Sequence, residues 1–454
     1  KQLFERRKGR MFTTEAYTII GGVVGAIATK ANEVLSELPE KVRGAFDTVF
    51  AELVQVQRDR PPTRNRAAFS LFEANQAAVQ LIEALAGQDC RVLVTSRGEQ
   101  EAMVEVAHEK LFSAWPELKD WIDNSDRDLR LIDFEEECAA RWHEKECRVQ
   151  SLWSHEQAVA VHRALARIKK ASTPRLQAFL HPQQILIERL NDEALSHQDR
   201  FLIGQKLEEF GDTRDGVGVK NGLPDIVWIE IPGGHVKLEG IDHVFQVKPF
   251  RIAKYPVTNA QFRSFLSMED GYGDAKWWKG ICQSEGPVEP SWREVNCPRE
   301  TVSWYEAVAF CRWLSTKLQT SIRLPTEWEW QQAATGGDPA REYPWEGRWD
   351  ASRCNSTESR LRRSAAVGLY PSSATQQGVV DMAGNVWEWC LNAYSEPEQP
   401  KAVRVNKKYG ARVVRGGSWA NVDPVGWNLL SRLSLASRGR FYILGFRLVQ
   451  ATEP

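Results

Sequence analysis

The sequence predicts an α+β protein in which an N-terminal α-helical, winged-helix region precedes a domain of short strands and tight turns. Composition changes near residue 215, because 14 of the 18 tryptophans follow that position whereas six of the eight histidines precede it. Before it, apolar residues recur at the three- and four-residue spacing of helices. After Pro224, short apolar runs separated by Pro and Gly turns indicate strands.

Charge and hydropathy restrict the class of partner. The net charge of -1 at pH 7 and the pI near 6.8 give no global attraction to nucleic acid or anionic membrane. No run of about 18 apolar residues is present, and the basic start lacks the apolar core of a signal peptide. We therefore expect a cytoplasmic protein that neither binds nucleic acid nor inserts into a membrane. Because the first residue is not Met, upstream sequence is left open.

The region 1–125 is predicted to contain a winged helix. Apolar residues from Gly25 to Leu38 repeat at helical spacing. Cys90–Ser96 is rich in β-branched residues and predicts a strand, Arg97–Gln100 predicts a turn, and Ala102–Ala107 predicts the returning strand. Helices followed by a small hairpin are typical of a winged helix.

The segment Val104–Trp121 carries a resemblance. Its Ala-His-Glu and Ala-Trp-Pro elements resemble the end of the winged-helix module in STAND-type signalling ATPases. The P-loop pattern G-x-x-x-x-G-K-[ST] is absent, so no ATPase activity is expected, and an NTPase region upstream of this chain is left open. The resemblance implies a nucleotide-sensing or interdomain role for His108; the alternative is a partly buried cap of the following helix.

Residues 126–215 are predicted to form an α-helical connector, which ends at the turn formers of Gly211–Gly218. His143, His155 and His162 raise the question of a metal site. Their spacings of 12 and 7 residues lack nearby cysteines or paired carboxylates. We therefore expect these histidines on solvated helix faces.

Two helices are predicted in the second half from apolar faces at helical spacing, over Thr258–Leu266 and Val302–Leu318. The second helix begins with Ser303 and Glu306 at the spacing of a capping box, in which each side chain bonds to the backbone N–H of the other. Large tryptophans in this half are expected first in the core. These tryptophans are Trp328, Trp330, Trp387 and Trp389.

Seven motifs give residues 222–451 a family resemblance. In order, they are Pro256-Val-Thr-Asn259, Val302-Ser-Trp-Tyr-Glu-Ala307, Arg323-Leu-Pro-Thr-Glu-Trp-Glu-Trp330, Tyr343-Pro-Trp345, Asp381-Met-Ala-Gly-Asn-Val-Trp-Glu-Trp389, Arg415-Gly-Gly-Ser-Trp419 and Gly445-Phe-Arg447. This series resembles the formylglycine-generating-enzyme, or sulfatase-modifying factor, domain family. The resemblance implies a variant of the C-type lectin fold, with a small antiparallel sheet, two helices and extensive loops.

The residues disfavour the oxidative chemistries that the resemblance suggests. Copper-dependent members use a cysteine pair near the end of the domain, but no cysteine follows Cys390, and Trp419–Gly445 contains no Met. Related iron-dependent sulfoxide synthases use a set of histidines, but none follows His243. We therefore expect no redox metal and no enzymatic activity. The alternative is an oxidoreductase of the sulfatase-modifying type that acts through unrecognised ligands.

The terminal segment points to binding. An irregular insert, Ala420–Ile443, lies between the motif-like ends Arg412–Trp419 and Leu444–Val449, and it holds many apolar residues with no His or Cys. Its position resembles that of the diversified segment in variable proteins of diversity-generating retroelements. In those proteins, adenine-directed mutagenesis changes residues at Asn-type template codons, and some carry STAND-like regions upstream.

Residue types reachable from an AAC codon by changing its first two bases define a candidate variable, ligand-binding set. They are Ala420, Val422, Asp423, Val425, Gly426, Leu433, Ser434, Leu435, Ala436, Gly439, Phe441, Tyr442 and Ile443. Trp427 joins the set either as a fixed residue or from another codon, since its own codon ends in G. Each apolar member alone could be core. Together they predict an exposed patch with Trp427, Phe441, Tyr442 and Arg440 as affinity anchors.

The resemblance also implies a structural Ca²⁺ site at Asp381, Glu388 and the backbone carbonyls of Gly384 and Val386, because hard oxygen donors on a turn suit this ion. Its role would be to stiffen the loop. The alternative is that Asp381 caps a turn and Glu388 is a buried ion-pair partner.

Together these inferences predict a non-enzymatic ligand-binding protein. Its lectin-fold head is expected to be diversified by a retroelement and joined through the helical connector to a STAND-type signalling region. The expected partner is a protein or a glycan of unknown identity.

Overall fold

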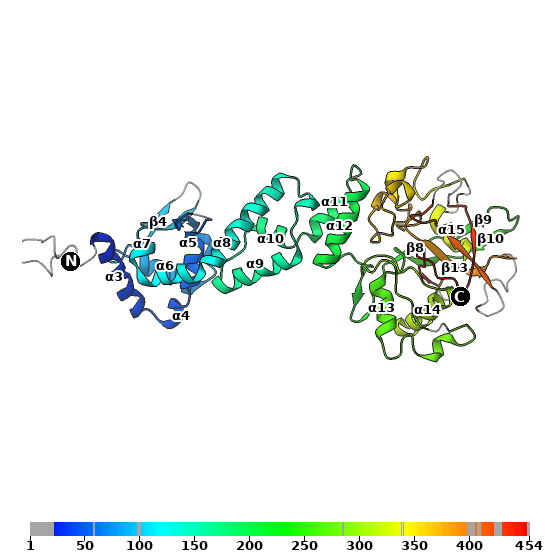
Figure 1. Ribbon diagram of the computed structural model, residues 1–454, viewed down its shortest axis with the longest axis horizontal. Helices are drawn as coiled ribbons and strands as arrows, with labels where there is room; N and C mark the ends of the chain where they lie inside the picture. Colours follow the sequence, from blue (N-terminus) through cyan, green and yellow to red (C-terminus); the bar gives the residue numbers. More distant parts are fainter. Residues whose placement is uncertain are drawn as a thin grey trace, which may run out of the picture. The chain divides into compact units, whose positions relative to one another are not determined.

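The computed structural model describes residues 22–57, 60–97, 101–283, 286–336, 338, 340–395, 397, 405, 410–421 and 429–451. They form a helical N-terminal region followed by a strand-rich domain, which confirms the predicted α+β class (Figure 1). The chain divides into two compact units, Lys1–Leu180 and His181–Pro454. None of the described helices combines the length and apolar composition needed to cross a membrane.

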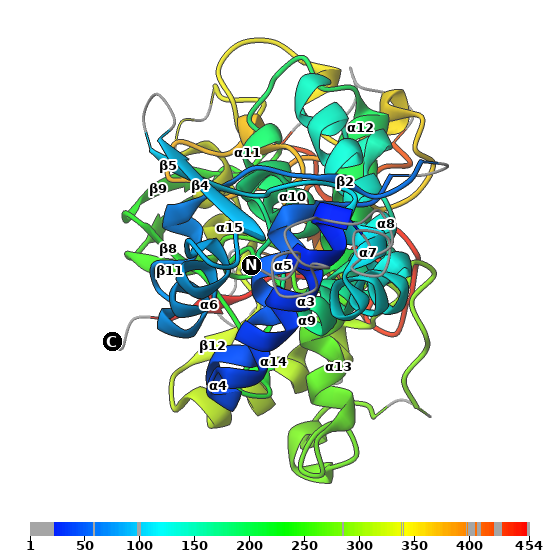
Figure 2. The same cartoon turned by 90° about the vertical axis from the view of Figure 1, so that its left-hand side faces the viewer.

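The first unit contains helices and a three-stranded sheet that fit a winged helix. Its first helices are α3 (Gly22–Glu37), α4 (Glu40–Arg43), α5 (Phe46–Leu53), α6 (Gln76–Ala86) and α7 (Leu111–Ala114), with the 3-10 helix η1 (Phe69–Leu71). The antiparallel sheet has the order β3 (Ala67–Ala68), β5 (Ala102–Val106), β4 (Leu93–Arg97), and β1 (Val54–Gln55) pairs with β2 (Thr63–Arg64). The β4–β5 hairpin (Figure 2) is the one that the sequence predicts.

The Ala-Trp-Pro element places a tryptophan in the core of this unit. Trp115 is fully buried, and its ring meets those of Phe46 and Phe50 at centroid distances of 5.6 and 5.5 Å. Its indole N–H donates to Asn32 at 2.7 Å. Nearby, the N–H of Lys110 donates to Nδ1 of His108 at 3.1 Å. His108 is exposed rather than partly buried, and α7 has no side-chain cap, so its contact with Lys110 is local to the turn before the helix.

A long helix crosses the predicted boundary at residue 125. Helix α8 (Pro116–Glu144) packs against α9 (His155–Ile168) and α10 (Pro174–Leu180), and η2 (Val149–Ser151) connects α8 to α9. Pro116 occupies the first turn of α8, where the missing N–H of proline costs no hydrogen bond. The winged-helix region and the first part of the connector therefore belong to one unit.

Helices α11 (Gln183–Arg189) and α12 (His197–Phe210) belong to the second unit rather than to a separate connector. In α12, the buried Arg200 donates to the carbonyls of Leu190, Asp192 and Leu369 at 2.7, 2.7 and 2.9 Å. The amide of Asn296 donates to the carbonyl of Gly204 at 3.0 Å. The predicted connector 126–215 is thus divided between residues 180 and 181.

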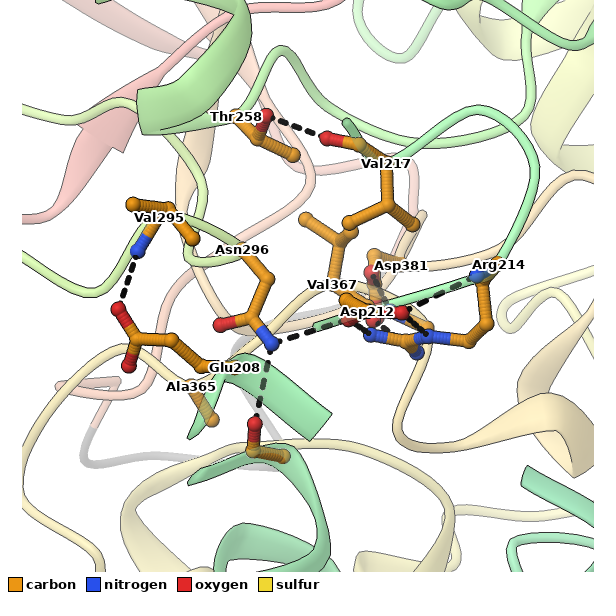
Figure 3. Close-up of polar contacts among 12 residues, drawn as sticks. Glu208, Asp212, Arg214, Val217, Thr258, Val295, Asn296, Ala365, Val367 and Asp381 are labelled. Atoms are coloured by element: carbon orange, nitrogen blue, oxygen red, sulfur yellow. Dashed lines mark hydrogen bonds and ion pairs between the residues drawn. The ribbon is translucent and has the colours of Figure 1, made fainter. Parts of the chain in front are cut away.

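The predicted linker Gly211–Gly218 lies within the second unit and packs against other residues of that unit (Figure 3). Asp212 and Arg214 form an ion pair at 2.6 Å with side chains only 5% and 7% exposed. Burial raises the pKa of Asp212, but the hydrogen bonds and charge of Arg214 outweigh it and hold this pKa below its ordinary value. Thr258 donates to the carbonyl of Val217 at 2.7 Å. The turn-forming residues of Gly211–Gly218 therefore belong to an ordered segment that contacts other residues of the second unit.

Two four-stranded sheets form the centre of the second unit. The first has the order β12 (Ile322–Arg323), β17 (Val449–Gln450), β11 (Phe250–Ala253), β8 (Trp228–Ile231). The second has the order β15 (Leu433–Ala436), β14 (Ala411–Arg415), β13 (Trp387–Ala393), β16 (Leu444–Gly445), with β13 and β16 parallel. Two small pairs are β6 (Val219–Lys220) with β7 (Leu223–Pro224) and β9 (Gly234–Lys237) with β10 (Val244–Val247).

Three helices with capping boxes accompany these sheets. They are α13 (Asn259–Ser267), α14 (Trp304–Leu318) and α15 (Glu327–Thr335), capped by Thr258, Ser303 and Thr326. The first two confirm the predicted helices, and the capping box at Ser303 is the predicted one. Short 3-10 helices are η3 (Ala275–Trp278), η4 (Ala351–Arg353), η5 (Thr357–Ser359) and η6 (Pro371–Ser373). Trp330, Trp387 and Trp389 are buried as predicted, whereas Trp328 is half-buried and stacks on Phe245.

Candidate functional site

The terminal segment begins at a turn that requires glycine. After β14, Gly416 and Gly417 have φ values of 97° and 74°, in the left-handed region that favours glycine. A Cβ on Gly416 would lie 3.1 Å from the ring of Trp330. The Arg-Gly-Gly-Ser-Trp motif therefore sets where the segment leaves the sheet.

Main-chain hydrogen bonds hold the backbone of the described part of this segment. Strand β15 pairs antiparallel with β14 along its full length. Three further N–H groups from the rest of the domain donate to its carbonyls: Thr301 to Phe441 at 3.0 Å, Trp304 to Ser437 at 3.1 Å and Trp387 to Ile443 at 2.8 Å. Because these bonds use backbone atoms, they do not depend on the side chains of the predicted variable residues.

The structure separates the predicted variable residues into three groups. Val422, Asp423, Val425, Gly426 and Trp427 lie outside the described residues. Exposed side chains belong to Leu433, Ser434, Ala436, Phe441 and Tyr442. Half-buried residues are Ala420, Leu435, Gly439 and Ile443, of which Leu435 and Ile443 pack against the core of the domain. The second group is the part of the set that a partner can reach directly.

A row of aromatic rings borders the exposed group. The ring of Tyr442, which is 51% exposed, lies 5.7 Å from that of Trp419, and Trp419 lies 6.4 Å from Trp292. The guanidinium of Arg363 lies 4.5 Å above the ring of Trp292. Aromatic and arginine side chains of this kind dominate binding energy at protein interfaces. Trp292 and Arg363 lie far from the segment in sequence, and no local pattern predicts their place here.

Arg440, a predicted affinity anchor, instead forms an internal ion pair. Its Nε and Nη2 donate to the two carboxylate oxygens of Glu306, both at 2.8 Å, and the Glu306 side chain is 0% exposed. Arg432 makes an equivalent pair with Glu327 at 2.7 and 2.8 Å. The prediction for Arg440 fails because a buried carboxylate, whose place the sequence does not show, competes for its guanidinium.

The predicted calcium ligand Glu388 is already paired. Arg447 donates to both of its carboxylate oxygens, at 2.6 and 2.7 Å, and the indole N–H of Trp330 donates to one of them at 2.8 Å. As placed, this carboxylate does not fit a calcium ion, because the cation it neutralises is Arg447. The contacts match the alternative of a buried ion pair.

The other predicted calcium ligands lie on the turn before β13. One carboxylate oxygen of Asp381 accepts from the N–H of Gly368 at 2.7 Å, and burial raises the pKa of Asp381 to about 6. Gly384 has a φ of 77°, and its N–H donates to the carbonyl of Gly416 at 2.9 Å; Val386 is buried. Asp381, Gly384 and Val386 stay predicted calcium ligands, whereas Glu388 is paired with Arg447.

The thiols of the domain are poorly placed for chemistry. Burial raises the pKa of the Cys297, Cys311, Cys354 and Cys390 thiols. Since the thiolate is the reactive form, these side chains are weak nucleophiles and weak metal ligands. Across the described ranges, no three His, Cys, Asp or Glu side chains gather in a group that could hold a metal ion.

Comparison with known families decides the nature of this domain. Residues 219–452 match the family described as sulfatase-modifying factor enzyme 1-like domain. The chain belongs to this family. Residues 1–150 match a second family, described as Novel STAND NTPase 1. Both resemblances seen in the sequence are thereby confirmed.

Relatives of the sulfatase-modifying factor domain differ in the activity that their names state. Hercynine oxygenase of Mycolicibacterium smegmatis is 29% identical over 277 residues, which cover 49% of this chain and 62% of the relative. Inactive C-alpha-formylglycine-generating enzyme 2 of Mus musculus is 28% identical over 246 residues, which cover 43% of this chain and 75% of the relative. The chain thus spans less than two thirds of the hercynine oxygenase, and the family contains both enzymes and an inactive member.

Solved structures align with about half of the chain. Treponema denticola variable protein 1 aligns with a TM-score of 0.37 at 20% identity, covering 50% of this chain and 95% of that chain. PvdO from Pseudomonas aeruginosa aligns with a TM-score of 0.42 at 21% identity, covering 53% of this chain and 100% of that chain.

Proposed function

We propose that the sulfatase-modifying factor domain of this chain is a non-enzymatic ligand-binding head. Its binding surface is the terminal segment, residues 420–443, and a retroelement diversifies that segment. The region that matches Novel STAND NTPase 1 is the signalling part of the same protein. The ligand is a protein or a glycan.

One observation supports this proposal above the others: the described part of the terminal segment combines a fixed backbone with exposed side chains. Its carbonyls accept from Thr301, Trp304 and Trp387, so the backbone course does not require particular variable side chains. Phe441 and Tyr442 are nevertheless 41% and 51% exposed. Large exposed apolar side chains on a held backbone are the arrangement that a binding surface needs, because little conformational entropy is lost when a partner docks.

The chemistry of the segment also favours binding over catalysis. Residues 420–443 contain no Cys, His or Met, so the segment offers none of the soft or imidazole donors that copper and non-haem iron take. Its two inward-facing arginines are paired with Glu306 and Glu327. Apart from Arg438, the exposed side chains in the described part of the segment are apolar or small, which suits recognition by shape and contact.

A binding screen of the full chain tests the proposal. The chain is screened against arrays of surface proteins and glycans, and each hit is repeated with Phe441→Ala and Tyr442→Ala. We expect Kd to rise by about tenfold or more in each variant, since an aromatic anchor at an interface contributes about 1.4 kcal/mol or more. Val244→Ala, an equally exposed apolar residue in β10, is the control and leaves Kd unchanged. Ligands whose Kd is unchanged by both aromatic substitutions would contradict the proposal.

The alternative is an oxidoreductase of the sulfatase-modifying type. The likeness to a hercynine oxygenase favours it. Oxidation of a cysteine-containing peptide is measured with the full chain, with copper or iron added in separate reactions. We expect no turnover above that of the free metal ion, whereas multiple turnovers would replace the binding proposal with this alternative.

A further inference from the structure

The terminal segment is tied to helix α14 by an arginine. Arg440 donates from Nε and Nη2 to separate oxygens of Glu306, and Nη2 also reaches the carbonyl of Gly286 at 2.8 Å. The same carboxylate accepts from the N–H and hydroxyl of Ser303, both at 2.8 Å, and from the hydroxyl of Tyr272 at 3.1 Å. Arg440 is therefore the cation that neutralises a carboxylate already fixed by the helix cap.

A second arginine ties the segment to helix α15. Arg432 donates from Nε and Nη2 to the two oxygens of Glu327, at 2.7 and 2.8 Å. Glu327 is the first residue of α15 and is 0% exposed, and it also accepts from Arg415 at 3.0 Å. The guanidinium of Arg432 lies 4.7 Å above the ring of Tyr394. Arg432 therefore makes the same kind of two-bond contact with a carboxylate as Arg440 does.

Both carboxylates are fully buried, so each arginine has a role that other residue types cannot fill. Removing Arg440 leaves Glu306 as a buried, uncompensated charge, which is strongly destabilising. Glu327 keeps its pair with Arg415 when Arg432 is removed, so Arg432 matters for holding the segment on α15. Lysine carries a single ammonium group and cannot supply two parallel N–H donors to one carboxylate. Substitution at either arginine therefore releases the segment from the helix it contacts.

We propose that Arg432 and Arg440 are fixed anchors inside the diversified segment. They are positioning residues that hold the backbone on Glu327 and Glu306, while the side chains between and beside them change. The idea rests on the proposed function, because only a diversified segment needs fixed points of this kind. The terminal segment then consists of two fixed anchors, Arg432 and Arg440, and of free positions at which the residue type changes.

The free positions are the members of the predicted variable set whose side chains are exposed. They are Leu433, Ser434, Ala436, Phe441 and Tyr442. Arg438 provides a matched control, since it is the same residue type two positions before Arg440. Its side chain is exposed, and its Nη2 donates to Sγ of Cys282 at 3.4 Å rather than to a buried carboxylate.

A sorted library tests which positions are fixed. Codons 432, 434, 438, 440 and 442 are randomised in the displayed full chain, and survivors of protease treatment are sequenced without any ligand present. We expect arginine at 432 and at 440 to be enriched at least tenfold over the input, with no residue enriched to that extent at 434, 438 or 442. Equal tolerance at 432, 438 and 440 would overturn the proposal.

Hydrogen exchange of single variants distinguishes positioning from general stability. We expect Arg440→Lys to speed exchange across residues 429–443 at least tenfold while strand β11 keeps its wild-type rate. Arg438→Lys leaves both regions unchanged. Uniform acceleration of the whole domain, or no change in 429–443, would overturn the proposal.

A double variant keeps the test decisive if Arg440→Lys does not fold. Glu306→Gln with Arg440→Met removes both charges, so the domain is expected to fold while residues 429–443 still exchange at least tenfold faster than in the wild type. Wild-type exchange in this variant would overturn the proposal. These measurements use no ligand, so they stand or fail separately from the binding screen that tests the proposed function.

Discussion

Arg447 and Glu388 form a bidentate ion pair in which both side chains are completely buried. The two N–H···O distances are 2.6 and 2.7 Å, and Arg447 also donates to the carbonyls of Ala253, Val380 and Asp381 at 3.0 to 3.2 Å. The Gly-Phe-Arg motif near the C-terminus is thereby joined to the Trp-Glu-Trp motif of β13. This pair links the two central sheets of the domain.

The first prediction concerns this pair. Arg447→Met is expected to lower the free energy of unfolding by about 3–5 kcal/mol, because Glu388 is left as an uncompensated buried charge. The double variant Glu388→Gln with Arg447→Met should lose less, since no charge remains. Denaturant unfolding of the full chain, followed by tryptophan fluorescence, measures both. If the double variant loses as much free energy of unfolding as the single variant, the loss does not come from an uncompensated charge on Glu388.

The second prediction concerns calcium. Glu388 cannot neutralise Arg447 and ligate calcium through the same two oxygens, so calcium added to chelator-treated protein is expected to leave Tm unchanged. Differential scanning calorimetry with and without millimolar calcium makes the comparison. A saturable rise in Tm that disappears in Glu388→Gln would instead establish the calcium site predicted from the family resemblance.

The third prediction uses two leucines of the terminal segment that differ in burial. Leu429 is 1% exposed and Leu433 is 45% exposed. Leu429→Ala is expected to lower the free energy of unfolding by about 2–5 kcal/mol, because it leaves a cavity in the core. Leu433→Ala is expected to change it by no more than about 0.5 kcal/mol. Similar losses in both variants, measured by denaturant unfolding, would show that the segment has no separate exposed set.

The fourth prediction concerns the pH dependence of helix α8. Burial raises the pKa of the Glu135 carboxyl from its ordinary 4.5 to about 7. The folded state therefore holds this proton more tightly than the unfolded chain does. The stability that Glu135 contributes is present below pH 4.5 and is lost as pH rises to about 7. The loss is about 3 kcal/mol at pH 8.

Substitution by glutamine isolates this contribution. Glu135→Gln is expected to remove the pH-dependent loss and to slow hydrogen exchange in α8 at pH 8, once intrinsic exchange rates are corrected. At pH 4.5 the variant and the wild type should differ little. Identical protection of α8 in the two proteins at pH 8 would show that the glutamate is not held in its protonated form.

Local patterns predicted the elements of the fold that depend on neighbouring residues. The spacing of Ser303 and Glu306 gave the start of α14, and β-branched residues gave the β4–β5 hairpin. Each feature depends on contacts between residues that are close in the sequence, so a local sequence pattern contains its physical cause. The family motifs added the architecture of the second unit, which periodicity alone does not contain.

Long-range partners account for what the sequence did not reveal. Gly211–Gly218 has the composition of a linker, yet the hydrogen bonds of Asn296 to Asp212 and of Arg214 to the Val367 carbonyl pack it on the domain. From the sequence, Arg440 resembles a solvent-facing anchor. In the folded domain it pairs with Glu306, which is 134 residues away in the sequence. A sequence pattern shows which side chains are charged, but only the fold shows which charges meet.

The DNA beside the coding region tests most directly whether the terminal segment is diversified for binding. Sequencing is expected to find a near-copy of the codons for residues 412–449 next to a reverse transcriptase. Differences between the two copies should lie at template adenines and fall on exposed positions such as 433, 434, 436, 441 and 442. A locus with no such copy, or with differences scattered over all bases and over the anchors at 432 and 440, would contradict the account.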